Sequence, residues 1–200
     1  MDVYEAAARR RSIRRFKDTP VVYSILERCV DAARLAPTAK NSQLCEYVVV
    51  DDERLLSRVL DTVLVWAGVP RPEAGWSPEH RPRGYIVTLI NTVLEAERGA
   101  GRRNVDYDAA LAVGNMVLVA EEQGLGSCII TSFDREKLRQ VLNVSGKYEI
   151  AILLALGFPD ESPVVEVAGD SVERWVDDRG VRHVPKRRLA DILHRNRFPG

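Results

Sequence analysis

The sequence predicts a fold that mixes helices and strands, of the α/β or α+β class, with helices in the larger share. Two observations carry this prediction. Apolar residues recur at helical spacing over about residues 19–36 and again over 105–123. Short β-branched runs, such as YVVV at 47–50 and YIVTLI at 85–90, separate the helical stretches and are typical of buried strands.

The bulk composition excludes several classes of protein. The chain has 29 basic and 29 acidic residues, which disfavours a nucleic-acid-binding protein with a basic surface. No apolar run approaches the ~20 residues of a membrane span, and the N-terminus does not fit a signal peptide. We expect a cytoplasmic protein with reduced thiols and no bound metal, because the few cysteines and histidines have no disulfide or ligand spacing. These residues are Cys29, Cys45, Cys128, His80, His183 and His194.

The first elements follow from capping residues and prolines. Asp2 and Glu5 have the spacing of a capping box, which predicts a short helix through about residue 10. Thr19-Pro20 opens a second helix, since proline is tolerated in the first turn, and Pro37 ends it.

A strand and a helix come next, followed by an irregular segment. YVVVDD at 47–52 is a strand, and Asp52 caps a helix through about Val65. Residues 66–84 are rich in proline and glycine, which predicts a variable loop or lid. The second strand, YIVTLI, follows this segment directly.

The second half of the chain contains the longest predicted helix, over residues 105–123. It is apolar on more than one face, which indicates a central helix or a subunit interface. Gly124 ends it. The remaining predicted elements are a strand at 127–131, a helix capped by Ser132 and running to 143, a strand at 149–158, a hairpin over 173–184 and a last helix at about 188–195.

The basic stretch RRSIRRF at 10–16 is the first candidate site. In an extended segment Arg10, Ser12 and Arg14 share one side, and Arg11 and Arg15 share the other. Guanidinium groups beside a hydroxyl match the oxygens of a phosphate. A solvated basic helix end and an RNA-binding patch are the alternatives.

Three further stretches offer polar groups. APTAKNSQ at 36–43 carries neutral donors and acceptors suited to a heteroaromatic ring, or is a plain connection between a helix and a strand. The glycines of GLGSC at 124–128 precede a strand and so fail the context of a dinucleotide-binding fingerprint. The strand end at Thr131-Ser132 exposes backbone N–H groups, and HVPKRRL at 183–189 adds a second basic cluster.

Taken together, these stretches resemble the FMN-dependent nitroreductase family over nearly the whole chain and in the right order. The motifs are RRSIRRF, APTAKNSQ, LAVGNMVLVAEEQGLGSCIITSFD, ALGFP and VPKRRLADIL. The resemblance implies one FMN-binding domain over residues 1–200, of α+β class, with a central, mostly antiparallel sheet flanked by helices. It also implies a homodimer with a long central interface helix and FMN sites built from both chains.

The resemblance also assigns roles to residues. Arg10 would bind the FMN phosphate, and Arg14 would stabilise the reduced flavin electrostatically at the polar edge of its ring. No side chain is implied as a catalytic acid or base. The resemblance implies further cofactor-binding residues in three groups. Arg11, Ser12, Lys186 and Arg188 would join Arg10 and Arg14. Pro37, Thr38 and Asn41 would come from the partner subunit, and Ile129, Thr131 and Ser132 would lie under the ring.

The implied activity is a two-step transfer of hydride from NADH or NADPH to a small-molecule acceptor such as a nitroaromatic compound or a quinone. The alternatives are other flavin chemistry, such as dehalogenation or flavin fragmentation, and a non-catalytic FMN- or nucleotide-binding protein. The family loop often continues as Asn-x-Gln-Pro-Trp, whereas this chain has NSQLCE at 41–46. Trp76, in the 66–84 segment, is a candidate to cap the flavin and contact substrate; the alternative is that it packs the loop onto its own subunit.

Overall fold

The computed structural model describes residues 1–66, 68–70 and 78–198. The chain forms two compact units, Met1–Asp160 and Glu161–Gly200, each of which is described by itself. The expectation of a single domain over the whole length therefore stays a prediction.

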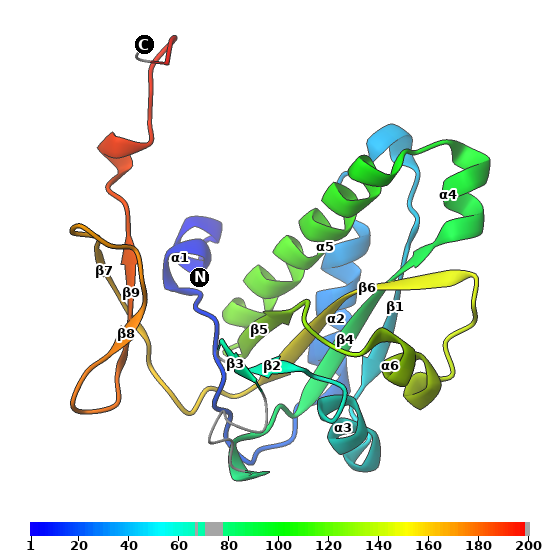
Figure 1. Cartoon of the computed structure of the whole chain (residues 1–200), viewed down its shortest axis with the longest axis horizontal. Helices are drawn as coiled ribbons and strands as arrows, with labels where there is room; N and C mark the ends of the chain where they lie inside the picture. Colours follow the sequence, from blue (N-terminus) through cyan, green and yellow to red (C-terminus); the bar gives the residue numbers. More distant parts are fainter. Residues whose placement is uncertain (67, 71–77, 199–200) are drawn as a thin grey trace. The chain divides into compact units, whose positions relative to one another are not determined.

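The first unit is built on a four-stranded sheet of order β1-β4-β6-β5 (Figure 1). Its strands are β1 (Cys45–Val50), β4 (Gly84–Asn91), β5 (Gly126–Ile130) and β6 (Tyr148–Gly157), and every neighbouring pair is antiparallel. All eight residues of β4 are buried, as expected for a central strand covered on both faces. The four predicted strands and the mostly antiparallel sheet are confirmed.

Helices α2 (Tyr23–Arg34) and α5 (Arg102–Glu122) cover one face of this sheet. Leu26 and Cys29 of α2 pack with Ile86 of β4 and with the apolar residues of α5. The buried residues of α5 recur at helical spacing and are Val105, Asp108, Ala109, Ala112, Val113, Met116, Val117 and Ala120. Helix α1 (Val3–Arg9) contacts α5 as well.

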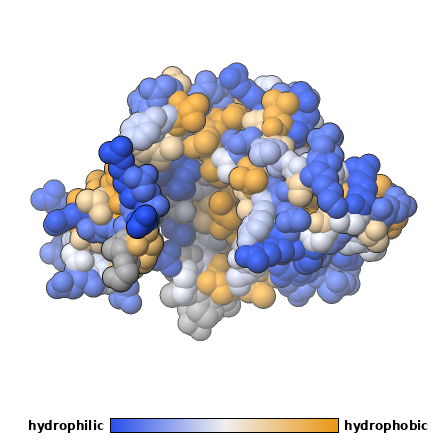
Figure 2. Space-filling model, turned by 90° about the horizontal axis from the view of Figure 1, so that it is seen from above, coloured by the Kyte–Doolittle hydropathy of each residue, from blue (hydrophilic) through white to orange (hydrophobic). Residues whose placement is uncertain are grey.

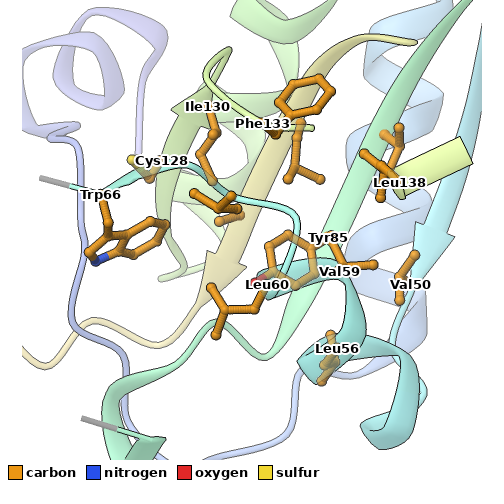
Figure 3. Packing of buried hydrophobic residues seen from close by; sticks show 14 of the residues in the cluster. Val50, Leu56, Val59, Leu60, Trp66, Tyr85, Cys128, Ile130, Phe133 and Leu138 are labelled. Atoms are coloured by element: carbon orange, nitrogen blue, oxygen red, sulfur yellow. The ribbon is translucent and has the colours of Figure 1, made fainter. Parts of the chain in front are cut away.

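Helices α3 (Glu53–Leu60) and α6 (Arg135–Leu142) cover the opposite face. Tyr85 and Val87 of β4 point to this side, since successive strand residues face opposite ways. Figure 3 shows Tyr85 in the same cluster as Leu56 of α3 and Leu138 of α6, and Val87 belongs to this cluster as well. The sheet is therefore buried between two helical layers. This arrangement confirms the α+β class.

The segment after α3 corrects one sequence prediction. The helix ends at Leu60, not near Val65, because the chain turns at Thr62, whose hydroxyl donates to the Val59 carbonyl at 2.7 Å. A short hairpin follows, with β2 (Val65–Trp66) paired to β3 (Val69–Pro70). Trp66 was expected in a loop but is 4% exposed in the core. A 3-10 turn, η3 (Pro78–His80), precedes β4.

Three other helices differ from the prediction. Helix α2 begins at Tyr23 after the N-cap residue Val22, not at Thr19-Pro20. The side chain of Asp134, not that of Ser132, caps α6 by accepting a hydrogen bond from the Lys137 N–H at 2.9 Å. Helix α4 (Thr92–Arg98) was not predicted; it begins at an Asn91 cap and ends at Gly99, whose φ is +57°. It is short and has no buried residue, so it lacks the apolar period on which the prediction depends.

The second unit contains a three-stranded sheet of order β7-β9-β8. β8 (Trp175–Val176) and β9 (Arg182–Lys186) form the predicted hairpin, and β7 (Val164–Val167) adds to it in parallel. The helix predicted at 188–195 is wrong. Only the 3-10 turn η4 (Leu189–Asp191) forms, because no side chain caps it and it buries no residue.

Two glycines allow the N-terminal segment to lie against the sheet of the first unit. A Cβ on Gly126 would stand 2.7 Å from the Ile13 side chain, and a Cβ on Gly157 would stand 2.8 Å from Phe16 Cδ1. Ile13 and Phe16 are both buried. The glycines of the GLGSC and ALGFP stretches are therefore sites of close approach.

We expect Gly126→Ala to lower the free energy of unfolding by about 1–3 kcal/mol, because the added methyl displaces the branched Ile13 side chain. Gly146→Ala is the matched control, since a Cβ there meets nothing within 4 Å. Urea unfolding of both variants measures the effect. Equal stability of the two variants would contradict the close packing of Ile13 on β5.

Candidate functional site

The basic segment at residues 10–16 lies along the free edge of β5. Ser12 forms a parallel bridge with Ser127, and the Ile13 N–H donates to the Ser127 carbonyl at 2.9 Å. Phe16 bridges to Pro159 beyond the end of β6. The segment is thus extended, as predicted, and its backbone is fixed by the sheet.

The arginines of this segment concentrate positive charge in a half-buried position. Arg11 donates to the Arg10 carbonyl at 2.6 Å, but its Nε is buried without a hydrogen-bond partner in the described part of the chain. Burial lowers the pKa of Arg11, and the charge of Arg10 lowers it further, while Glu121 acts in the opposite direction. A buried donor and two adjacent guanidinium groups favour a bound anion.

The end of β5 next to this segment is apolar and open. Ile129 is 48% exposed, although its neighbours Cys128 and Ile130 are buried. Thr131 is exposed and Ser132 half-buried; the Ser132 carbonyl accepts a hydrogen bond from Leu64 N–H at 3.0 Å. The structure therefore brings Arg10, Arg11, Ser12 and Arg14 to the same strand edge as Ile129, Thr131 and Ser132.

Apolar side chains are exposed elsewhere in the first unit too. Figure 2 shows several orange groups between hydrophilic residues on the face that it draws. On α5, Tyr107 and Leu111 are 52% and 49% exposed, one helical turn apart. A Cβ on Gly114, the next residue on that side, would meet nothing within 4 Å. The helix thus buries one face in its own subunit and leaves an apolar stripe on another.

The polar stretch at 36–43 forms a tight loop that contains the 3-10 turn η1 (Ala39–Asn41). Pro37 and Asn41 are exposed and Thr38 is half-buried. Leu44, which replaces the family's proline, is 1% exposed and packs with Val105 and Ala109 of α5. Leu44, at which the chain departs from the family pattern, thus anchors the loop by apolar packing beneath it.

The loop and the basic segment lie far apart within one subunit. The loop is bound to Asp108 of α5, whereas Arg9 lies 3.7 Å from Glu121 near the other end of that helix. These helix residues are thirteen positions apart, which is about 20 Å at 1.5 Å per residue. The loop also leads into β1, at the sheet edge opposite β5. One chain therefore does not bring these two candidate motifs together.

The cofactor-binding role of every predicted site residue remains a prediction, and three of these residues lie outside the part of the first unit that the structure describes. Lys186 and Arg188 are exposed side chains of the second unit. Trp76 lies outside the described residues.

The cysteines are free thiols, and two of them have strongly shifted pKa values. Burial raises the pKa of Cys29 to about 12. Burial, followed by the charge of Asp108, raises the pKa of Cys45 to about 11. Neither is a thiolate near neutral pH, so neither has the properties of a nucleophile. In the described ranges no group of three His, Cys, Asp or Glu residues could hold a metal, and no helix is long and apolar enough to cross a membrane.

The first unit is thus an α+β fold with a basic, partly apolar strand edge. A model of the nitroreductase family matches residues 7–158. The chain belongs to the nitroreductase family.

Relatives with several different names resemble this chain. An NADH dehydrogenase of Thermus thermophilus is 28% identical over 80% of this chain and 88% of its own length. An iodotyrosine deiodinase of Thermotoga neapolitana is 26% identical over 80% and 89%. A 5,6-dimethylbenzimidazole synthase of Rhodospirillum rubrum is 24% identical over 79% and 82%.

Solved structures share the fold. An FMN-dependent nitroreductase from Clostridium difficile aligns with a TM-score of 0.67 and 24% identity, over 96% of this chain and 98% of that chain. A nitroreductase-type protein from Desulfovibrio desulfuricans in complex with FMN aligns with a TM-score of 0.70 and 21% identity, over 100% and 99%. These neighbours confirm the nitroreductase fold.

The raised pKa of Cys45 predicts a loss of stability in alkaline solution. The folded state keeps this thiol protonated up to about pH 11, whereas an unfolded thiol ionises near pH 8.5. Its contribution to stability is complete below pH 8.5 and is lost as the pH rises towards 11. Urea unfolding from pH 8 to 10.5 should show a smaller loss for Cys45→Ala than for the wild type. The same loss in both proteins would show that this thiol does not titrate with folding.

Proposed function

We propose that the protein is an FMN-dependent oxidoreductase that uses NADH or NADPH to reduce a small acceptor such as a nitroaromatic compound or a quinone. The observation that carries this proposal is the half-buried basic segment fixed beside the open, apolar end of β5. Membership of the nitroreductase family supports it. The free thiols fit a cytoplasmic location, which is part of the proposal.

The residues of the strand edge suit both parts of FMN. Arg10 provides a guanidinium group for the phosphate. Arg11 faces the other side of the extended segment and contributes positive charge nearby, with a buried Nε that the described residues leave without an acceptor. The exposed Ile129 side chain offers an apolar contact to the ring. Thr131 and Ser132 stand at the strand end, where backbone groups can meet the ring edge.

When bound, FMN supplies the hydride chemistry, first with NAD(P)H and then with the acceptor. The protein supplies position and charge. Arg14 follows Ser12, which pairs in parallel with Ser127, so it lies further along β5 towards the strand end than Arg10 does. Its positive charge would stabilise negative charge on the polar edge of the ring. An arginine stays protonated, so we assign no side chain as acid or base.

The complete site would need two copies of the chain. Thr38 and Asn41 lie some 20 Å along α5 from the basic segment, too far for both motifs to contact one ring in the same subunit. The stripe of Tyr107, Leu111 and Gly114 offers a surface for the second copy. We therefore propose a homodimer in which Pro37, Thr38 and Asn41 of one chain face the basic segment of the other. The resemblance to the family also implies Lys186 and Arg188 as phosphate-binding residues, and both are exposed in the second unit.

The visible spectrum of the purified protein tests the function. Flavin absorbance that bleaches anaerobically on addition of NADH or NADPH, and returns with a quinone or nitroaromatic acceptor, is the expected result. A protein that binds FMN without bleaching would be a binding module. A protein that binds no FMN would refute the proposal.

A second candidate chemistry is favoured by the names of the relatives, which include a deiodinase and a dimethylbenzimidazole synthase. Both would use the same FMN site with a different second substrate. Product analysis with a halophenol, with a nitroaromatic compound and with reduced FMN in air separates these chemistries. If the protein turns over only the halophenol, dehalogenation is its activity and the acceptor that we propose is wrong.

We expect Arg10→Ala to weaken FMN binding about ten- to a hundredfold, because a charge-assisted contact contributes roughly 1.5–3 kcal/mol. Arg58→Ala is the control, since Arg58 is exposed on α3, on the opposite face of the sheet from α5. Quenching of flavin fluorescence during titration of the apoprotein gives both dissociation constants. An unchanged value for Arg10→Ala would remove this residue from the site.

We expect Leu111→Asp to convert the dimer to a folded monomer without FMN, because the substitution places a charge in the exposed apolar stripe. Val117 is unsuitable for this purpose, since it is 6% exposed inside its own subunit. Light scattering and circular dichroism at several concentrations measure assembly and folding. A wild-type monomer that retains FMN at micromolar concentration would contradict the shared site.

A further inference from the structure

The loop before β1 has an unusual backbone for residues that are not glycine. Lys40, Asn41 and Gln43 have φ angles of 55°, 53° and 47°, in the left-handed region. Each such residue costs of order 1 kcal/mol and persists only when its surroundings fix it. Three within four positions require a strong anchor, and strained backbone of this kind clusters at ligand sites.

The anchor is the buried carboxylate of Asp108 on α5. The Ala39 N–H donates to its Oδ1 at 3.0 Å and to its Oδ2 at 3.2 Å, and the Ser42 hydroxyl donates to Oδ2 at 3.3 Å. Asp108 is 4% exposed. Among the described residues, no lysine or arginine lies within ion-pair distance of it. The Ala39 N–H and the Ser42 hydroxyl are therefore the hydrogen-bond donors that compensate for burial of this carboxylate.

The carboxylate acts as a cap supplied from another element. Ala39 is the first residue of η1, and the preceding Thr38 makes no side-chain capping bond. Asp108 accepts the free N–H in its place, across 69 positions of sequence. Arg98 donates to the Ser42 carbonyl, so Ser42 is held through its backbone and through its hydroxyl. The side chains of Asn41 and Gln43 are left exposed.

We propose that Asp108 is a positioning residue for the flavin site: it holds the Thr38–Gln43 loop in the conformation that receives the ring. This inference rests on the proposed function for its ligand. Asp108 does not touch the cofactor; it acts by fixing the loop before binding, which lowers the entropy cost of association. Because Tyr107 and Leu111 lie beside it on α5, the same helix carries both the loop anchor and the proposed dimer stripe.

Two readouts on a graded set of variants test the proposal. Asp108→Ala removes both acceptors, whereas Asp108→Asn keeps one oxygen and the shape of the side chain. Asp106→Asn is the matched control, an exposed carboxylate two residues away that pairs with Arg102 at 3.0 Å. Val113→Ala, in the core beneath α2, controls for loss of stability alone. The readouts are hydrogen exchange of the loop amides in the apoprotein and the dissociation constant of FMN.

The expected result for Asp108→Ala is faster exchange at Ala39 and Ser42 and an FMN dissociation constant about tenfold higher or more. Asp108→Asn should stay within about threefold of the wild type, and both controls should leave the FMN constant unchanged. If Asp108→Ala is too unstable to purify, Ser42→Ala tests the same contact. Unchanged loop exchange in Asp108→Ala or Ser42→Ala would overturn the anchoring role.

The two proposals fail in different ways. Faster loop exchange with unchanged FMN affinity would show that Asp108 holds the loop but that the loop is not at the flavin, which overturns this inference alone. A wild-type protein that binds no FMN refutes the proposed function and, with it, the ligand named here. An equal loss of affinity in Val113→Ala would show that stability, not position, controls binding.

Discussion

Helix α5 sets the distance on which the whole site depends. It holds the polar loop through Asp108 near its beginning and, through Glu121 near its end, contacts Arg9, the residue just before the basic segment. The helix is rigid because its buried face packs between α2 and the sheet. A rigid separation of about 20 Å means that two motifs in one sequence cannot serve one ring in one subunit. The homodimer that we propose would resolve this, and the exposed apolar stripe on the same helix offers a surface for it.

The basic segment owes its position to small residues elsewhere in the chain. Its backbone bonds to the free edge of β5 at Ser127, and Gly126 and Gly157 leave the space that Ile13 and Phe16 fill. The buried apolar residues of the segment hold it to the sheet, while Arg10, Arg11 and Arg14 remain half-buried and Arg15 is exposed. Packing therefore fixes where the charge is, and the concentrated charge then favours an anion.

The sequence predicted the sheet and the long helix well, because β4 and β6 are continuous apolar runs and α5 is a long stretch rich in Ala, Val, Leu and Met. It also predicted the extended basic segment. It could not place Trp66, since an irregular stretch gives no period to read, and it assigned the α6 cap to Ser132 where the nearer Asp134 competes better. Asp108 was missed altogether: an acidic residue in a helix rich in Ala and Val is a visible signal, but its partners are 69 positions away. Glycines 126 and 157 were read as parts of motifs, and their role needs the three-dimensional neighbours Ile13 and Phe16.

The most direct test of the shared site is the FMN content of a hybrid dimer. One chain carries Arg10→Ala with Arg14→Ala, and the other carries Thr38→Ala with Asn41→Ala; each variant alone should bind no FMN. If the motifs of one site come from different chains, the co-expressed hybrid contains one intact site and one doubly altered site. The account predicts one FMN per hybrid dimer. A hybrid that binds none would show that each site is built within a single chain and would contradict the account.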